Sequence, residues 1–594
     1  MSQALEPGTM TALSASRTHA TQWRVAVAAR LDFSLYLALG LIGMSLAWLI
    51  PGRFLPWPAF RQEVIAAAGF ALLATAALQK CKRVAWPRMS FLILGVAAVP
   101  IIQWGFGLIL FRGDAIVCSL YLAAFALSVC VGATLAHSEL RQQLLDGLTM
   151  SLVFVALLSA GMAFNQWLGP SVLDGIVEPM QPRGRPYANL GQANHLATQL
   201  VLGVAAAWYW YEKRRISAWC AALAISWMAW GVVLTEARTA WLAAAIVVLW
   251  WLLMRRRVSL RSSPVAITMG SVAFVIGVCI APTLQGAWSG PPELDGAPPQ
   301  LRLAAGTRGG HWQTLWDALL RSPWFGYGWN QVSNAQFVAA GDHPAIREWA
   351  TFSHNLMLDL LIYNGLPLGL LLCAALVGWF ARRVVGCRSV ESWWLLLTLF
   401  VLFLHALLEY PLYYSYYLLP SGLLMGIVRP STVEPMRAVR APRLTLALPA
   451  LGLALLAGAI GLEYLKAEEA LRDLELTARR IGPAASELPR ADWFFVDGWA
   501  AYHRAVTVRV DAGMPANEIE NLRKVARRYP YPNVLERYAL AAALNGQSDA
   551  ARHVLLHSCK VHTVPICEGM QRRWNTLQSE YPALQPLAFP ALTK

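Results

Sequence analysis

Residues 216–257 read ISAWCAALAISWMAWGVVLTEARTAWLAAAIVVLWWLLMRRR. Two apolar runs, at 216–235 and 239–254, are separated only by the polar turn around Glu236 and Arg238, and three arginines follow the second run. Each run is about long enough to cross a hydrocarbon core of ~30 Å as a helix. Cytoplasmic loops carry the excess of Lys and Arg. The stretch therefore predicts a pair of transmembrane helices whose connecting turn faces outward.

The composition of the whole chain extends this interpretation. Of 594 residues, 57% are hydrophobic and 14% are charged, and the mean hydropathy is +0.44. These values exclude a soluble enzyme. The formal charge of +15 is scattered over short loops rather than gathered on one module, which argues against a nucleic-acid partner. We expect an all-α polytopic membrane protein.

Apolar runs of about 17 to 25 residues predict about thirteen spans. They lie at about 32–50, 60–79, 90–110, 115–135, 148–168, 193–211, 216–235, 239–254, 264–281, 354–380, 392–409, 412–428 and 444–464. Residues 1–31 form a polar tail without a small-residue cleavage site, so the first run is predicted to be a retained span.

Loop charges predict the orientation. With residues 1–31 in the cytoplasm, the Lys- and Arg-rich connections fall on the inner side, as the positive-inside rule requires. An odd number of spans then exports three larger segments, 169–192, the loop 282–353 and the tail 465–594. We expect a transmembrane domain over 32–464, a large periplasmic loop and a C-terminal periplasmic domain.

The exported tail has a helical pattern. Val534–Leu540 is followed by a turn at Gly546 and a second helix, which is similar to one tetratricopeptide-like unit, and a plain helical bundle is the alternative. Because the tail lies in an oxidising compartment, Cys559 and Cys567 are expected to form a disulfide that closes a short loop.

Polar residues gather in the outer segment 181–195, directly before a span. Amide and imidazole groups there can hydrogen-bond a polar ligand at the interface, and Arg183 and Arg185 can neutralise phosphate. The candidates are Arg185, Tyr187, Gln192, Asn194 and His195. A helix cap with a solvated loop is the alternative interpretation.

Two further arginines lie on the outer side. Arg238 lies in a turn so short that its charge must lie at the membrane surface. A charged side chain there is costly in free energy unless it binds a ligand or pairs with Glu236. Arg308 precedes an amphipathic helix with aromatic residues at Trp312 and Trp316, and its place near a helix N-terminus favours phosphate. The aromatic run 323–329 suits either sugar stacking or membrane anchoring.

His354 stands where the large loop re-enters the membrane. A neutral imidazole there can act as a base near pH 7. Asp359 lies about 140° around the helix from it at 100° per residue, so we expect Asp359 to have a structural role, in which it can pair with Asn355 four residues away. His405 and Glu409 are four residues apart, and a mutual pair is slightly favoured over support of the site, with Tyr410 next to them.

The outer segments hold no Asp-x-Asp motif and no His/Cys cluster, and no Walker loop occurs in the chain. We therefore expect metal-independent chemistry without a cofactor. Arginine, histidine and aromatic residues suit transfer of a group from a diphosphate-activated donor, with Arg stabilising the leaving group.

These motifs resemble the superfamily of bacterial O-antigen ligases and Wzy-type polymerases, and more narrowly the PglL-type O-linked protein oligosaccharyltransferases. Residues 189–197 (NLGQANHLA) are similar to the narrower group's Asn-Leu-x-Gln-Pro-Asn-His-Leu-Ala element, with Ala193 in place of Pro. Residues 405–411 also resemble that group, whereas Arg238, Arg308 and Ser353–Asn355 resemble the wider ligase core. The resemblance covers about 150–430.

The resemblance implies transfer of a whole glycan from undecaprenyl diphosphate to Ser or Thr of a periplasmic protein, at the outer face of the bacterial inner membrane. It implies His354 as the catalytic base with inversion at the anomeric carbon, and Arg238, Arg308 and Arg185 as diphosphate-binding residues. Substrate-positioning roles fall to Gln192, Asn194, His195, Tyr187, His405, Glu409 and Tyr410. The alternatives are ligation to the lipid A core, polymerisation of repeat units, and, from another class, a transporter, flippase or scaffold.

Overall fold

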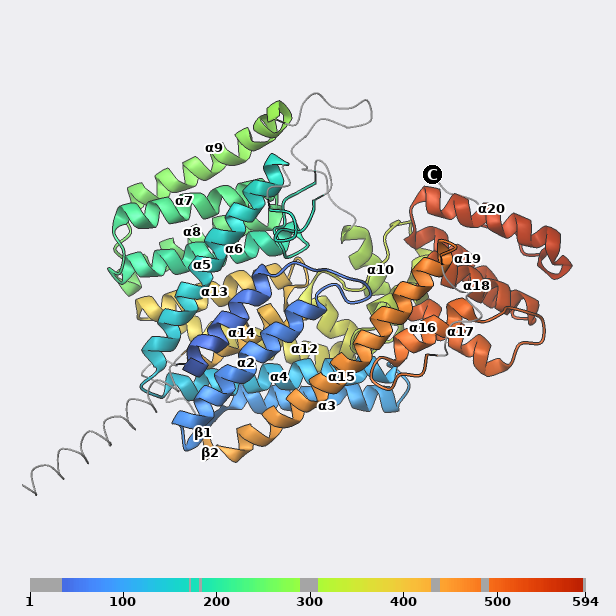
Figure 1. The fold of residues 1–594 in the computed structure, drawn as a ribbon, viewed down its shortest axis with the longest axis horizontal. Helices are drawn as coiled ribbons and strands as arrows, with labels where there is room; N and C mark the ends of the chain where they lie inside the picture. Colours follow the sequence, from blue (N-terminus) through green and yellow to red (C-terminus); the bar gives the residue numbers. More distant parts are fainter. Residues whose placement is uncertain are drawn as a thin grey trace, which may run out of the picture.

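The computed structural model describes residues 35–169, 173–180, 184–288, 308–428, 438–481 and 491–590. Most of these residues are helical, which confirms the all-α fold class (Figure 1). The predicted cytoplasmic tail at 1–31 lies outside the described residues, as do 289–307 of the large loop.

In the described part of the chain, eight helices are long and apolar enough to cross a membrane. They are α2 (Phe60–Lys80), α3 (Arg88–Gly105), α4 (Arg112–Ala136), α5 (Arg141–Leu168), α8 (Arg238–Val258), α9 (Pro264–Trp288), α12 (Leu356–Val385) and α15 (Leu444–Ala478). Shorter apolar helices are Leu35–Leu49, α7 (Ala218–Leu234) and α13 (Val390–Ala406). The two other predicted spans coincide with α6 (Ala193–Glu212) and α14 (Ser415–Ile427). The chain is a multi-pass membrane protein, and the count of thirteen crossings stays a prediction.

The membrane helices form two groups that meet along α13 and α14. One group contains α2, α3, α4, α14 and α15, and the other contains α5 to α9 (Figure 1). Glycines allow the closest approach, because a Cβ at Gly132 of α4 would lie 2.2 Å from the Leu423 carbonyl oxygen of α14. Small residues commonly allow such close packing between membrane helices.

A short antiparallel ribbon was not predicted from the sequence. β1 (Arg83–Pro87) pairs with β2 (Ala438–Pro442), with Arg83 opposite Pro442. The ribbon ties the connection between α2 and α3 to the start of α15. Its strands are five residues long and contain proline, so no alternating pattern distinguishes them from loop.

The described part of the large loop packs against helix α12. It contains α10 (Arg308–Arg321) and α11 (Val332–Ala339), followed by the short 3-10 helix η1 (Ala340–Asp342). Helix α12 breaks at Gly365, whose φ is 73°. Tyr327 donates its N–H to the Ile362 carbonyl at 2.7 Å, and Leu366 donates to the Pro323 carbonyl at 2.7 Å. The loop thus satisfies backbone groups that the break leaves open.

The tail is helical, as predicted. Its helices are α16 (Asp497–Thr507), α17 (Ala516–Arg528), α18 (Pro532–Leu544), α19 (Ser548–Val561) and α20 (Val564–Glu580), followed by the short 3-10 helix η4 (Pro582–Leu584). Another short 3-10 helix, η2 (Pro411–Tyr413), lies between α13 and α14. Gly546, with φ at 78°, makes the predicted turn between α18 and α19. Cys559 and Cys567 form the expected disulfide. Helix α15 continues to Ala478, beyond the predicted end of the span at 464.

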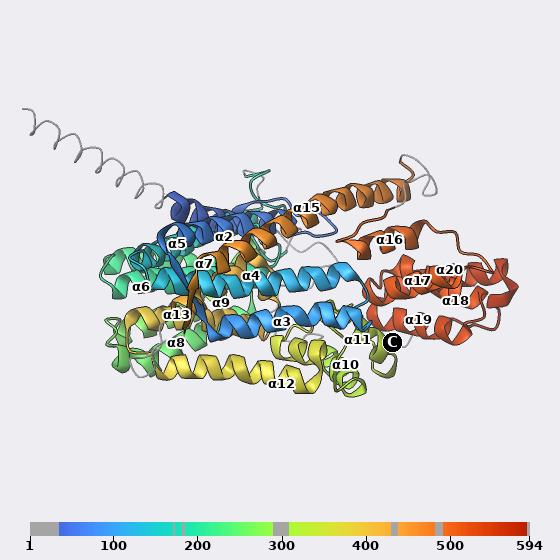
Figure 2. The ribbon, with the colours of Figure 1, turned by 90° about the horizontal axis from the view of Figure 1, so that it is seen from below.

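The tail docks on the N-terminal end of α4 (Figure 2). The Asp497 carboxylate accepts the Gly113 N–H at 2.8 Å and the Arg112 N–H at 3.0 Å, which caps α4. Arg528 of α17 forms a two-pronged ion pair with Asp114, at 2.6 and 3.0 Å. Both side chains are nearly buried, so removing one partner would leave an uncompensated charge.

Candidate active site

Glu409 is the hub of a hydrogen-bond network. It lies in the connection between α13 and α14, and its side chain is only 2% exposed. Its carboxylate accepts from Asn194 Nδ2 at 2.6 Å, Gln192 Nε2 at 3.2 Å and His354 Nδ1 at 2.8 Å. Arg308 forms an ion pair with the same carboxylate. Four segments that are far apart in the sequence therefore meet at one side chain.

His354 is held in an uncommon backbone conformation, with φ at 57°. Its neighbours enforce this geometry: Asn355 caps α12 by accepting from the N–H groups of Met357 and Leu358, and the Ser353 N–H donates to Asp359 at 2.9 Å. Backbone strain of this kind gathers at functional sites. Because Nδ1 faces Glu409, Nε2 is the ring nitrogen that can take a proton from a substrate.

Two expected local pairs are wrong. Glu409 pairs with His354 rather than with His405, both of whose ring nitrogens lack a hydrogen-bond partner within the described residues. Asn355 uses its side chain as a helix cap rather than to bind Asp359. In both cases the spacing of four residues permits a contact, but a longer-range or capping partner takes the polar group.

The environment keeps Glu409 ionised. Burial by itself would raise its pKa, but the hydrogen bond from His354 and the positive charge of Arg308 outweigh burial and hold the pKa below the ordinary value. The carboxylate is thus an acceptor for the imidazole at neutral pH, and it can stabilise a positive charge that forms on the ring.

The three predicted arginines differ in how closely they join this network. Arg308 contacts Glu409 from the first turn of α10. Arg185 donates to Asn194 Oδ1 at 3.1 Å and to the Thr235 carbonyl at 2.7 Å, so it bridges the network to the turn between α7 and α8. Arg238 is exposed at the first position of α8, in that same turn. Residues 181–183 lie outside the described part.

Aromatic and imidazole rings fill the space behind the network. The Tyr410 ring lies edge-on to His354, with centroids 5.1 Å apart, and edge-on to His195 at 5.6 Å. His195 and His405 lie 5.3 Å apart, and both are buried. Tyr187 does not join this group, since its hydroxyl donates to the Pro179 carbonyl at 2.6 Å.

Sequence reasoning missed Arg53, which lies between the first two membrane helices. Its guanidinium donates to the Leu190 carbonyl at 2.8 Å, beside the Gln192–His195 element. Gly191 has φ at 69°, and a Cβ there would lie 2.3 Å from the Arg53 guanidinium carbon. The sequence around Arg53 contains no motif that predicts this contact, because the partner lies about 140 residues away.

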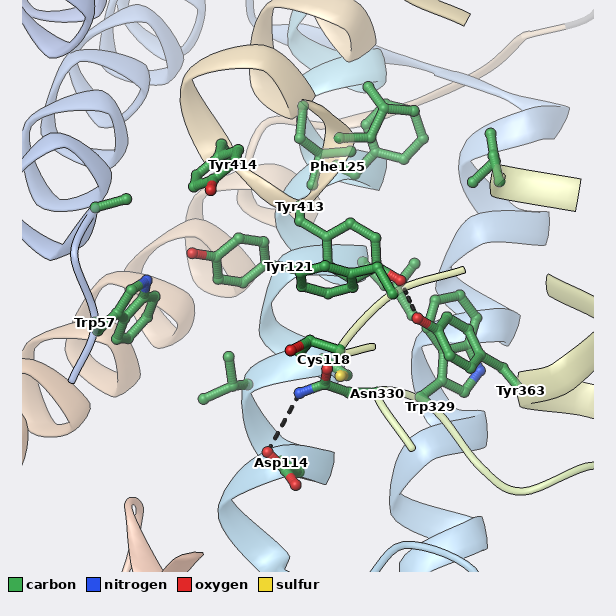
Figure 3. A pocket seen from close by; sticks show the side chains of 18 of the residues that line it. Trp57, Asp114, Cys118, Tyr121, Phe125, Trp329, Asn330, Tyr363, Tyr413 and Tyr414 are labelled. Carbon is green, nitrogen blue, oxygen red and sulfur yellow. Dashed lines mark hydrogen bonds between the residues drawn. The ribbon is translucent and has the colours of Figure 1, made fainter. Parts of the chain in front are cut away.

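A cavity of about 670 Å³ borders the site (Figure 3). Phe352 and Leu356, on either side of His354 in the sequence, line it, and its wall runs from Met89 in the first turn of α3 to Trp499 in the tail. The lining is mostly apolar and aromatic, with Tyr121, Tyr363 and Tyr413 among the rings that Figure 3 labels. Its charged members are Arg53 and the mutually paired Asp114 and Arg528.

Three family models match the segments that build this site. Residues 186–211 match the family described as Protein glycosylation ligase, residues 223–373 match O-Antigen ligase, and residues 393–563 match Virulence factor membrane-bound polymerase, C-terminal. They contain, in that order, Gln192 and Asn194, then Arg308 and His354, then Glu409. The fold and the site define a multi-pass membrane glycosyltransferase.

Two relatives from Acinetobacter baylyi narrow this class. The General O-oligosaccharyltransferase is 32% identical over 406 residues, covering 67% of this chain and 71% of the relative. The ComP-specific O-oligosaccharyltransferase is 25% identical over 406 residues, covering 66% and 71%. The chain belongs to the O-oligosaccharyltransferase family, which confirms the resemblance stated from the sequence motifs.

Proposed function

We propose that this enzyme transfers a preassembled oligosaccharide in one step from undecaprenyl diphosphate to the hydroxyl of Ser or Thr in a periplasmic protein. The observation that carries the proposal is the 2.8 Å hydrogen bond between His354 Nδ1 and Glu409, next to Arg308. The Acinetobacter relative named as a general O-oligosaccharyltransferase supports transfer to oxygen.

In this mechanism His354 is the general base. Its Nε2 takes the proton of the acceptor hydroxyl while the oxygen attacks the anomeric carbon, and the bond from that carbon to the diphosphate oxygen breaks. Direct displacement inverts the anomeric centre. Glu409 fixes the tautomer of the ring and stabilises the imidazolium that forms, as a carboxylate does in a catalytic triad.

Arginine supplies the charge that the departing diphosphate requires. Arg185 binds the Thr235 carbonyl in the turn between α7 and α8, Arg238 begins α8 after that turn, and Arg308 pairs with Glu409. Guanidinium groups bind phosphate oxygens in pairs and can replace a divalent cation as leaving-group stabilisers. We therefore propose a metal-independent reaction without a cofactor.

The remaining site residues position the substrates. Gln192 and Asn194 hold Glu409, and Tyr410, His195 and His405 form the ring cluster behind His354. The apolar cavity suits part of the isoprenoid chain of the donor, because its wall extends along α3 and α4. Tyr187 stabilises its own loop through the hydrogen bond to the Pro179 carbonyl.

We also propose the membrane arrangement. The protein would lie in the bacterial inner membrane with the site on the periplasmic face, a cytoplasmic tail at 1–31, a transmembrane domain at 32–464 with a ligase core at about 150–430, and a periplasmic domain at 465–594. Ligation to the lipid A core is the second candidate, favoured by the O-Antigen ligase match at residues 223–373.

Deletion of the gene in the source organism separates the two acceptors. Glycoproteins and lipopolysaccharide are analysed in parallel, and the deletion is complemented with wild type or His354→Ala. We expect glycoproteins to disappear, lipopolysaccharide to keep its O-chains, and His354→Ala to fail although its membrane abundance is normal. Persisting glycoproteins with lost O-chains would replace this proposal with the ligase alternative.

A further inference from the structure

A second cavity, of about 480 Å³, lies away from the Glu409 network. Its wall is formed by the segment after α3 (Gly107–Leu110), by Ser322, Gly326 and Tyr327 of the large loop, and by one face of α17. From α17 come Glu520, Arg523, Lys524 and Arg527. The cavity thus joins the outer end of a membrane helix to the tail.

The charge in this cavity is unbalanced. Arg523 and Glu520 neutralise each other through two hydrogen bonds of 2.6 Å. Lys524 and Arg527 make no salt bridge with any described residue, and the other lining residues carry no formal charge. The cavity therefore has a net charge of about +2, which favours an anionic ligand.

Two buried polar atoms here have no partner. Arg527 Nε and Asn334 Oδ1 are buried without a hydrogen bond in the described structure, and Asn334 also lines the cavity. Burial and the charge of Arg523 lower the pKa of Arg527. Unsatisfied buried groups of this kind are costly. An anionic oxygen would accept from Arg527 Nε, and a hydroxyl of the same ligand would donate to Asn334 Oδ1.

The surroundings of the cavity match a membrane surface. On α3, the exposed side chains Phe91, Ile101 and Ile102 form an apolar surface, and Trp104 at its outer end lines the cavity. Trp324 and Phe325 are 71% and 72% exposed beside the lining residues Ser322 and Gly326. Aromatic side chains at this level are typical of the membrane–water interface.

We propose that this cavity binds the phosphate headgroup of an anionic phospholipid, whose acyl chains lie along the exposed face of α3. Lys524 and Arg527 bind the phosphate, and the Asn334 amide meets a headgroup hydroxyl. The lipid anchors α17, and with it the tail, to the membrane surface. This role is independent of the glycosyl-transfer chemistry.

Lipid retention by the full-length protein tests the proposal. The protein is reconstituted in nanodiscs that contain phosphatidylglycerol and phosphatidylcholine and is then released from them. Native mass spectrometry measures how many molecules of each lipid remain bound. We expect phosphatidylglycerol to be retained preferentially, with about fivefold loss in Lys524→Gln and about thirtyfold loss in Lys524→Gln/Arg527→Gln, since each cation contributes about 1 kcal/mol at an anionic surface. Lys524→Arg should retain the lipid.

Controls keep the result interpretable. Arg572→Gln, on an exposed position of α20, removes the same charge from the tail outside the cavity and should retain wild-type lipid binding. Lys524→Gln alone tests the site if the double variant fails to fold. Equal retention by Lys524→Gln and wild type would overturn the proposal. Displacement of the lipid by soluble glycerol phosphate at similar affinity would also overturn it, because the site would then bind a free anion.

Discussion

At the residue scale, the site depends on a contact between His354 and Glu409, which are 55 residues apart in the sequence. The imidazole needs an ionised acceptor, and the pKa of Glu409 is held below its ordinary value by His354 and Arg308 against the effect of burial. The carboxylate therefore stays ionised as pH falls through the ordinary carboxyl range, and it loses this role only at lower pH.

Glu409→Gln tests this contact. The amide keeps the size of the side chain but removes the charge, so we expect the transfer rate to fall by about 100- to 10,000-fold, the range that general-base catalysis contributes. Rates are measured with saturating donor, and Glu469→Gln on the exposed side of α15 is the matched control. An unchanged rate in Glu409→Gln would remove the carboxylate from the mechanism.

Gly191 supports a second prediction. Its φ of 69° already disfavours a side chain, and a Cβ would also displace Arg53. Gly191→Ala should lower both transfer activity and thermal stability. Gly169→Ala is the matched control, because its φ of 81° imposes similar strain but a Cβ there meets no atom within 4 Å. If the two variants behave alike, the contact with Arg53 is unimportant and backbone strain explains both.

At the scale of elements, the membrane helices could be predicted from the length of the apolar runs. A run of about 20 apolar residues is the length that a helix needs to cross the membrane. The site was only partly predictable. Arg308, His354 and Glu409 could be named from local polar clusters beside apolar runs, but their partners could not. Residues four apart share a helix face, so the sequence favoured His405 as the partner of Glu409. The spacing of residues within one helix cannot predict a contact with a distant segment, such as the one with His354.

The interface between α19 and α11 should be sensitive to acid. His557 is buried with its ring centroid 4.5 Å from that of Phe337, and burial, aided by the charges of His553 and His562, lowers its pKa to about 3. A histidine freed by unfolding has a pKa of about 6.5, so the unfolded form binds more protons between these values. The stabilising effect is complete above about pH 6.5 and declines as pH falls toward 3.

Protease resistance of the tail, followed between pH 8 and pH 5, measures this effect. We expect wild type to lose resistance as pH falls, and His557→Phe, which cannot titrate, to lose less. His503 and His562 also have lowered pKa values, so the variant should keep some slope. An identical slope in His557→Phe and wild type would contradict the assignment to His557.

At the scale of the whole molecule, α10, which contains Arg308, and the tail lie toward the same end of the membrane bundle (Figure 2). Arg257 at the end of α8 donates to the Val385 carbonyl, at the opposite end of α12 from His354. The β1–β2 ribbon precedes α3, whose other end leads into the cavity shared with the tail. The positive-inside rule then predicts that the site and the tail both face the periplasm. Alkaline phosphatase fused near Gly546 should be active, and a fusion near Arg257 should be inactive. The reverse pattern would invert the topology.

The most direct test of the central claim is transfer by the purified enzyme in a reconstituted membrane. The mixture contains undecaprenyl-diphosphate-linked oligosaccharide, an acceptor protein with a Ser/Thr-rich segment, and EDTA, without nucleotide, and the acceptor is weighed by intact-mass spectrometry. We expect the acceptor to gain the mass of one whole oligosaccharide on a Ser or Thr with wild-type enzyme, and no such gain with His354→Ala. Full transfer by His354→Ala, or a requirement for added divalent metal, would contradict the account.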